Sequence, residues 1–163
     1  MDNEEYFKVL ELEQAKKTKE GFALLLRLVE EKHPLALLDM STRYHSTEGF
    51  VYPVEEMSTD EKKSEELVLI AKEKLEQLSA AGDGEAMRLL ASTYLGHWHP
   101  VHEKSVEKAE QLLLKAYEAD CYFAANDLAL FYLGSGDREK AKFWYQEAEQ
   151  HQCRVIKDDR LQT

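Results

Sequence analysis

The sequence predicts an all-α protein built from repeated helix pairs, and three observations support this fold class. The 163-residue chain has only 7 Gly and 3 Pro, while 33% of its residues are charged, which favours regular helix over a turn-rich β architecture. Residues 84–96 (GEAMRLLASTYLG) align with residues 122–134 (YFAANDLALFYLG) at an offset of 38. Large apolar residues in both segments recur three or four positions apart, which is the spacing of one helix face.

Periodicity and boundary signals predict eight helices. We expect them at residues 3–15, 18–32, 34–45, from about 61 to 81, 84–96, around 108–116, 122–134 and around 140–148. The first helix is expected to bury Tyr6, Phe7 and Leu10, with Val9 as a further candidate. The second is expected to bury Phe22, Leu25, Leu26 and Val29.

Capping residues mark several of these helix ends. Ser58 and Glu61 have capping-box spacing ahead of the long fourth helix, and Asp83 is placed to cap the fifth. Pro34 suits the first turn of the third helix. One short connection near the C-terminal end is expected to combine a C-cap, a tight turn and an N-cap at Gly134, Gly136 and Asp137.

The helices that follow the two aligned segments also match each other. Residues 108–116 (KAEQLLLKA) align with residues 140–148 (KAKFWYQEA) at an offset of 32, so the earlier repeat carries six extra residues, in a loop that contains HWHPVH. A weaker upstream copy places Ala36, Met40, Ser41 and Tyr44 at the equivalent positions. We predict one domain over residues 1–155, with N-terminal helices (3–32), a degenerate repeat (34–82), well-defined repeats (84–148) and a polar tail (156–163).

The pattern of Ala, Leu-Ala, Tyr-Leu-Gly and then Lys-Ala-x-x-Trp-Tyr-x-x-Ala resembles the Sel1-like repeats, which are relatives of the tetratricopeptide repeats. The resemblance implies a right-handed superhelix of antiparallel helical hairpins that binds other proteins and needs no cofactor. It also implies that the first helix of each hairpin lines a concave binding surface. Trp144 and Tyr145 have helical spacing with Ala141 and Ala148, so we expect them in the repeat core rather than in a ligand-stacking platform. In the register of the family, the binding surface comprises Leu38, Thr42, Arg88, Ser92, Asn126 and Leu130.

The net charge of −11 indicates which class of partner the chain binds. Residues 1–60 hold 7 basic and 13 acidic side chains, and residues 61–163 hold 14 and 19, so the acidity is spread along the chain. Nucleic-acid affinity comes largely from Lys and Arg that neutralise phosphates, so DNA or RNA binding is disfavoured. A basic protein partner is favoured instead.

The remaining features bear on compartment and chemistry. The acidic N-terminus and the lack of a long apolar stretch favour a cytoplasmic protein that does not cross a membrane. We further expect a monomer or weak dimer that does not bind a membrane. Cys121 and Cys153 have neither redox nor zinc-ligand spacing and are expected to be free thiols. We find no nucleophile elbow, phosphate-binding glycine loop or linked Cys and His, so the sequence does not favour an enzyme.

Two irregular segments leave alternatives open. His97, His99 and His102 have H-x-H-x-x-H spacing, which can suit Zn²⁺ or Ni²⁺, although an exposed loop with no further clear ligand is the simpler interpretation. Phe50 and Tyr52 lie in an irregular stretch and either anchor a partner or fold back over the first repeat. Trp98 is a third candidate contact with the partner, or packs against a neighbouring helix.

These observations favour a protein-binding module, and its most specific form is a cytoplasmic inhibitor, such as an immunity protein that neutralises a basic toxin domain. The first alternative is a general scaffold or regulatory adaptor that holds a peptide on the concave surface. The second is a metal-dependent protein organised around His97, His99 and His102. The small size and strong acidity of the chain favour the inhibitor, because an acidic surface speeds association with a basic enzyme.

Overall fold

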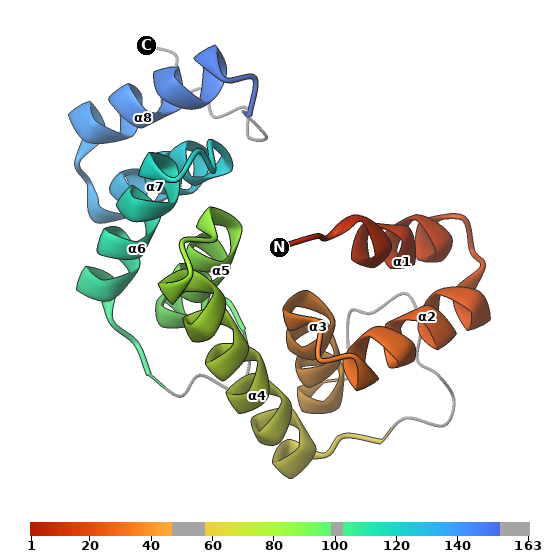
Figure 1. Ribbon diagram of the computed structural model, residues 1–163. Helices are drawn as coiled ribbons and strands as arrows, with labels where there is room; N and C mark the ends of the chain where they lie inside the picture. The colour runs from red at the N-terminus through yellow and green to blue at the C-terminus, as the bar shows by residue number, and fades with distance from the viewer. Residues whose placement is uncertain (47–57, 99–102, 154–163) are drawn as a thin grey trace. The chain divides into compact units, whose positions relative to one another are not determined.

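A computed structural model describes residues 1–46, 58–98 and 103–153, and within these ranges the chain is helical, with no strand (Figure 1). The helices are α1 (Glu4–Gln14), α2 (Thr18–Glu30), α3 (Pro34–His45), α4 (Glu61–Ala80), α5 (Gly84–Leu95), α6 (Val106–Glu118), α7 (Phe123–Ser135) and α8 (Arg138–Gln150). Helices that follow one another in sequence pack together, as α1 does with α2, α5 with α6 and α7 with α8. The all-α class is therefore confirmed. Among the described helices, none has both the length and the apolar character of a membrane span.

The chain forms two compact units. Unit 1 contains residues 1–77 and 96–104, and unit 2 contains residues 78–95 and 105–163. The boundary lies inside α4, so one continuous helix contributes residues to both units. A single domain over residues 1–155 stays a prediction.

The close approach of α1 and α2 sets the core of unit 1. A Cβ atom at Gly21 of α2 would lie 3.3 Å from the backbone oxygen of Val9 in α1, so a larger side chain there would push the helices apart. This contact turns Leu25 and Leu28 inward, and both are buried, whereas Leu26 is 42% exposed. The predicted burial of Leu26 is therefore wrong, and so is that of Phe7, which is 52% exposed.

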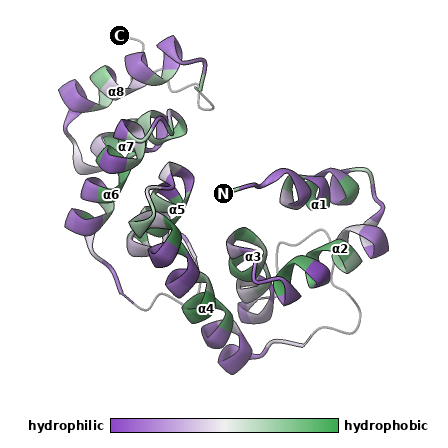
Figure 2. Cartoon of the chain, viewed as in Figure 1, coloured by the Kyte–Doolittle hydropathy of each residue, from purple (hydrophilic) through white to green (hydrophobic). Residues whose placement is uncertain are grey.

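The core of unit 2 follows the aligned positions of the sequence. Four of the pairs at an offset of 38 are buried, namely Ala86 and Ala124, Leu90 and Leu128, Ala91 and Ala129, and Tyr94 and Tyr132, whereas Leu95 and Leu133 are half-buried. Three of the pairs at an offset of 32 are buried too, namely Ala109 and Ala141, Leu113 and Tyr145, and Ala116 and Ala148. Trp144 is half-buried and less enclosed than a core residue. Figure 2 shows hydrophilic and hydrophobic residues alternating along α4, as expected for a helix with one buried face.

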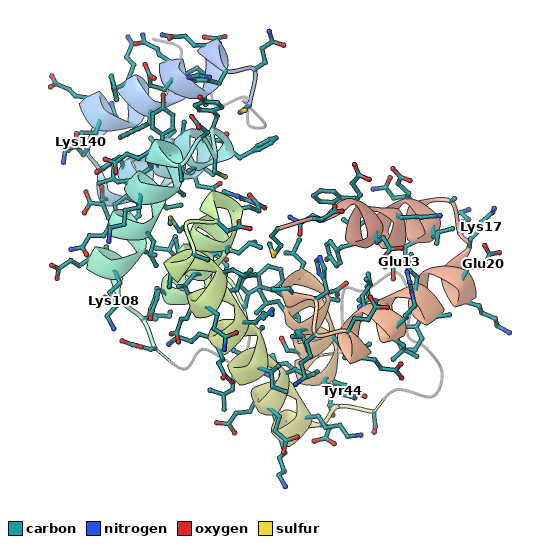
Figure 3. The ribbon with its side chains drawn as sticks, in the orientation of Figure 1. Glu13, Lys17, Glu20, Tyr44, Lys108 and Lys140 are labelled. Atoms are coloured by element: carbon teal, nitrogen blue, oxygen red, sulfur yellow. The ribbon has the colours of Figure 1, made fainter. Side chains whose placement is uncertain are left out.

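The same set of contacts recurs where α4, α6 and α8 begin. In each case the residue before the helix accepts a hydrogen bond from the backbone N–H of a Lys three positions later, and the Lys ammonium lies over a Tyr ring of the preceding helix. The three sets are Tyr44, Asp60 and Lys63; Tyr94, Ser105 and Lys108; and Tyr132, Asp137 and Lys140, with Lys Nζ 5.3, 5.1 and 4.7 Å from the ring centroid (Figure 3). Asp60 therefore caps α4, and the capping box predicted at Ser58 and Glu61 is wrong.

Left-handed residues end several of the helices. Gly136, with φ 86°, is the C-cap of α7, and Gly134 lies inside that helix rather than at its end. Four residues other than glycine, Lys16, Lys32, Asp120 and Gln152, take the same conformation just after α1, α2, α6 and α8. Because glycine is the usual residue here, these helix ends carry no strong sequence signal.

Candidate protein-binding surface

Four of the predicted binding residues lie on α5 and α7, which meet in unit 2. Arg88 of α5 and Asp127 of α7 are joined by an ion pair of 2.9 Å. Ser92 follows Arg88 by four positions on α5, and Leu130 follows Asn126 by four positions on α7, so each pair shares a helix face. We call this surface the α5–α7 face, and its residues are Glu85, Arg88, Ser92, Asn126, Asp127 and Leu130.

Arg88 is held at the centre of the α5–α7 face by carboxylates from both helices. Its Nε and Nη2 atoms donate to the two oxygens of Glu85 at 2.8 and 2.7 Å, and Nη1 donates to Asp127 at 2.9 Å. Burial lowers the pKa of Arg88, but its hydrogen bonds and charge interactions with Glu85 and Asp127 outweigh burial and raise that pKa above its ordinary value. The guanidinium is therefore permanently charged, fixed in orientation and surrounded by an excess of negative charge.

The other members of the face differ in exposure. Ser92 and Leu130 are half-buried, and the Ser92 hydroxyl donates to the backbone oxygen of Leu89 at 2.6 Å. Asn126 is 9% exposed and contributes little surface. The face therefore offers a partner mainly the ion-paired groups, Ser92 and the side of Leu130.

The predicted contribution of the first repeat is different. Leu38 is completely buried, so its placement on an exposed binding surface is wrong. The reason is that α3 is buried around nearly its whole circumference, including Asp39 and Arg43, which leaves no exposed face at Leu38. Thr42 is half-buried, and its hydroxyl donates to the backbone oxygen of Leu38 at 3.0 Å.

The irregular segments lie partly outside the described residues. Phe50 and Tyr52 are outside them, as are His99 and His102. His97 is exposed and Trp98 is half-buried just after α5. Within the ranges that the structure describes, no group of three or more His, Cys, Asp or Glu side chains could hold a metal ion. The histidine metal site and the binding role of Phe50 and Tyr52 stay predictions.

A buried ion cluster in unit 1 was not predicted. Arg43 of α3 pairs with Asp39 at 2.8 Å and with Glu13 of α1 at 2.9 Å, and the three side chains are 5%, 7% and 15% exposed. Tyr6 of α1 donates to Asp39 at 3.4 Å, and burial, followed by the charge of Asp39, raises the Tyr6 pKa well above its usual value. Glu13 is labelled in Figure 3. The spacing of Asp39 and Arg43 is a visible signal for an ion pair, whereas its burial and the contribution of Glu13 depend on tertiary structure.

An aromatic cluster in unit 2 was also not predicted. It consists of Tyr117 at the end of α6, Tyr122 before α7, and Trp144 and His151 of α8 and its C-cap. Tyr117 contacts the other three rings edge to face, with centroid distances of 5.7 Å to Tyr122, 5.0 Å to Trp144 and 6.0 Å to His151. Tyr122 and His151 stack at 3.7 Å. The four rings come from three segments that are separate in sequence, so periodicity does not indicate the cluster.

Cys121 contacts Glu85 of the α5–α7 face and is expected to be an unreactive thiol. Its Sγ donates to Glu85 at 3.3 Å, and burial, together with the negative charge of Glu85, raises the Cys121 pKa to about 12. An ordinary cysteine has a pKa of about 8.5, and the thiolate is the reactive form, so at pH 8.5 Cys121 should react with iodoacetamide more than about a hundredfold more slowly than such a thiol. Peptide mapping by mass spectrometry measures this rate. The control is the same reaction in urea, where Cys121 should react normally, and equal rates in the two conditions would contradict the predicted protection.

Comparison of the chain with protein-family models gives no match, and comparison with curated proteins finds no significant similarity. The resemblance to Sel1-like repeats therefore stays a prediction.

Proposed function

We propose that this chain is a protein-binding module that recognises a basic protein partner, and that it acts as a cytoplasmic inhibitor of the immunity type. In this proposal the helix pairs form a right-handed Sel1-like superhelix, and the α5–α7 face is part of the surface that the partner contacts. The module carries out no reaction and needs no cofactor.

The observation that carries the proposal is the acidic excess of both compact units. Unit 1 contains 19 acidic and 12 basic residues, and unit 2 contains 13 and 9. Both units therefore have a negative electrostatic potential, and the two potentials add at a distance. The combined potential attracts a basic protein and repels nucleic acid. Such steering mainly raises the association rate, which suits an inhibitor that must bind its target quickly.

The geometry of the α5–α7 face supports the same proposal. Arg88 is already fixed by Glu85 and Asp127, so these groups lose little conformational freedom when a partner binds. A basic side chain of the partner can approach the outer sides of the same carboxylates, which are about one quarter exposed (21% for Glu85 and 28% for Asp127). The half-buried Leu130 adds an apolar contact beside them.

The test begins with affinity capture by the tagged chain, identification of the captured protein by mass spectrometry, and kinetic measurement with the purified pair. Raising NaCl from about 50 to about 200 mM should slow association by about tenfold and change dissociation much less, because salt screens steering more than short-range contacts. Surface-plasmon kinetics separates the two rates.

Two variants locate the surface. Leu130→Ala on the α5–α7 face should speed dissociation, whereas Gln146→Ala, at an exposed position on α8, should leave both rates unchanged. An acidic captured protein, or an association rate that is indifferent to salt, would refute the proposed recognition of a basic partner. Salt-independent binding that an extended peptide displaces would instead indicate the adaptor function.

A further inference from the structure

We propose that the aromatic cluster of Tyr117, Tyr122, Trp144 and His151 is a binding site for a cationic side chain, an Arg or Lys of the basic protein partner. We call this binding site the cation seat. This inference rests on the proposed function and names the chemistry of one contact. It involves residues of unit 2 and adds a second surface to the α5–α7 face.

The cluster has the composition that recognises cations. A Lys or Arg is attracted to the face of an aromatic ring when it lies within about 6 Å of the ring centroid. Tyr117, Tyr122 and Trp144 are half-buried and His151 is exposed, so each ring of the cluster keeps contact with solvent. Tyr117 meets its three neighbours edge to face, whereas Tyr122 and His151 stack at 3.7 Å and cover one face of each other, so a cation has to approach the ring faces that these contacts leave uncovered.

Two carboxylates lie at the edge of the aromatic cluster and are oriented by it. The Tyr117 hydroxyl donates to Glu147 of α8, and the Tyr122 hydroxyl donates to Asp120 at 2.8 Å. Each carboxylate accepts one of these bonds and keeps further acceptor positions. A guanidinium or ammonium group bound over the rings would therefore also lie close to the negative charge of these two carboxylates.

The hydrogen bond with Glu147 has a second consequence. Together with a smaller effect of burial, it raises the pKa of Tyr117 to about 12. The phenol therefore stays neutral at physiological pH and keeps donating to Glu147. The arrangement of ring and carboxylate is maintained without any ligand.

Three other tyrosines of the chain have a Lys ammonium over the ring, a contact that the aromatic cluster lacks. Tyr44, Tyr94 and Tyr132 each have a Lys ammonium of the same chain over the ring, at 5.3, 5.1 and 4.7 Å. Within the described part of the chain, no Lys or Arg lies over the four rings of the aromatic cluster. Two carboxylates, Asp120 and Glu147, accept hydrogen bonds from the tyrosines of the cluster. The four rings thus have carboxylates beside them and no Lys or Arg of the described chain over them. This arrangement favours binding of a cation from another protein.

The test uses the full chain with Trp98→Phe, which leaves Trp144 as the sole tryptophan. The probe is the peptide acetyl-Gly-Arg-Gly-Arg-Gly-amide, and the matched control has citrulline at both arginine positions, which keeps the shape and removes the charge. We expect a saturable change in Trp144 fluorescence with the arginine peptide and none with the citrulline peptide. The measurement is a titration at low ionic strength, where exposed charge interactions are least screened.

Substitutions within the cluster identify the groups that bind. Tyr122→Leu removes a ring and should weaken binding about two- to fivefold, which corresponds to the cation–π interaction of an exposed site. Tyr122→Phe keeps the ring and should bind within about twofold of the parent chain. Glu147→Gln should weaken binding by a factor similar to that of Tyr122→Leu. Circular dichroism of each variant shows whether the helices are retained.

Four outcomes would overturn the inference. The first is equal binding of the arginine and citrulline peptides, and the second is unchanged binding in Tyr122→Leu. The third is binding that appears only when the chain ends at Cys153, because Arg154, Lys157 or Arg160 of the chain itself would then be the occupant. Saturable binding of a short oligothymidylate at these rings would likewise contradict a cation seat.

The proposed function is tested separately from this seat. If the captured basic partner binds the Tyr122→Leu chain with unchanged kinetics, the seat is refuted and the proposed function stands. If the peptide binds as expected and the captured partner is acidic, the seat stands and the proposed function fails.

Discussion

Replacing Arg43 by Met should lower the free energy of unfolding of unit 1 by about 3 to 5 kcal/mol, because it removes the cation from a buried ion cluster and leaves two carboxylates without it. Arg43 is 5% exposed and lies 2.8 Å from Asp39 and 2.9 Å from Glu13. The Met side chain fills most of the space of the Arg stem, so the loss measures charge more than cavity formation. The measurement is urea unfolding followed by circular dichroism.

Unit 1 also supplies a matched control for this experiment. Arg27 of α2 pairs with Glu5 of α1 at the same distance of 2.8 Å, but these side chains are 48% and 58% exposed. Arg27→Met should therefore cost much less than Arg43→Met, because a solvated ion pair contributes little to stability. Equal costs for Arg43→Met and Arg27→Met would show that burial does not determine the strength of these two interactions.

Replacing Tyr132 by Ala should lower the free energy of unfolding of unit 2 by about 3 to 5 kcal/mol, the usual cost of truncating a large buried aromatic residue. Tyr132 is 6% exposed, its hydroxyl donates to Glu110 of α6, and Lys140 of α8 lies over its ring. The substitution thus removes a contact with each of two neighbouring helices. Tyr132→Phe keeps the ring and should cost much less.

The control for Tyr132 lies on the same helix. Phe123 is the first residue of α7 and is 51% exposed, so Phe123→Ala should change stability by no more than about 0.5 kcal/mol. Urea unfolding of the two variants gives the comparison. A Tyr132→Ala chain as stable as Phe123→Ala would mean that the aligned tyrosine is not part of the core. Trp144→Ala should fall between them, because Trp144 is half-buried.

Local sequence signals were sufficient to predict the helices. The range predicted for α3, residues 34–45, matches the structure, and the Asp83 cap is confirmed by its hydrogen bond with the N–H of Ala86 at 2.9 Å. Capping groups and apolar periodicity act within one or two helix turns, so a single sequence contains the information. The self-alignment also identified the buried positions of unit 2, because the same small and large residues recur where helices touch.

Binding residues were harder to predict, because exposure depends on neighbours that are distant in sequence. Register placed Leu38 on the same surface as Arg88 and Asn126, yet α3 is enclosed and Leu38 is buried. Asp127 was not anticipated as a member of the α5–α7 face, although it holds Arg88 at 2.9 Å across two helices.

The sequence by itself determined the helical class, most helix positions, the apolar repeat of unit 2 and the acidic charge, since these depend on composition and short-range order. Tertiary structure decided which helix face is turned inward, as the close approach at Gly21 does for α2. It also assembled the ion cluster around Arg43 and the rings around Tyr117. These groups come from separate helices, and their contacts exist only once helix packing has set the distances and excluded water.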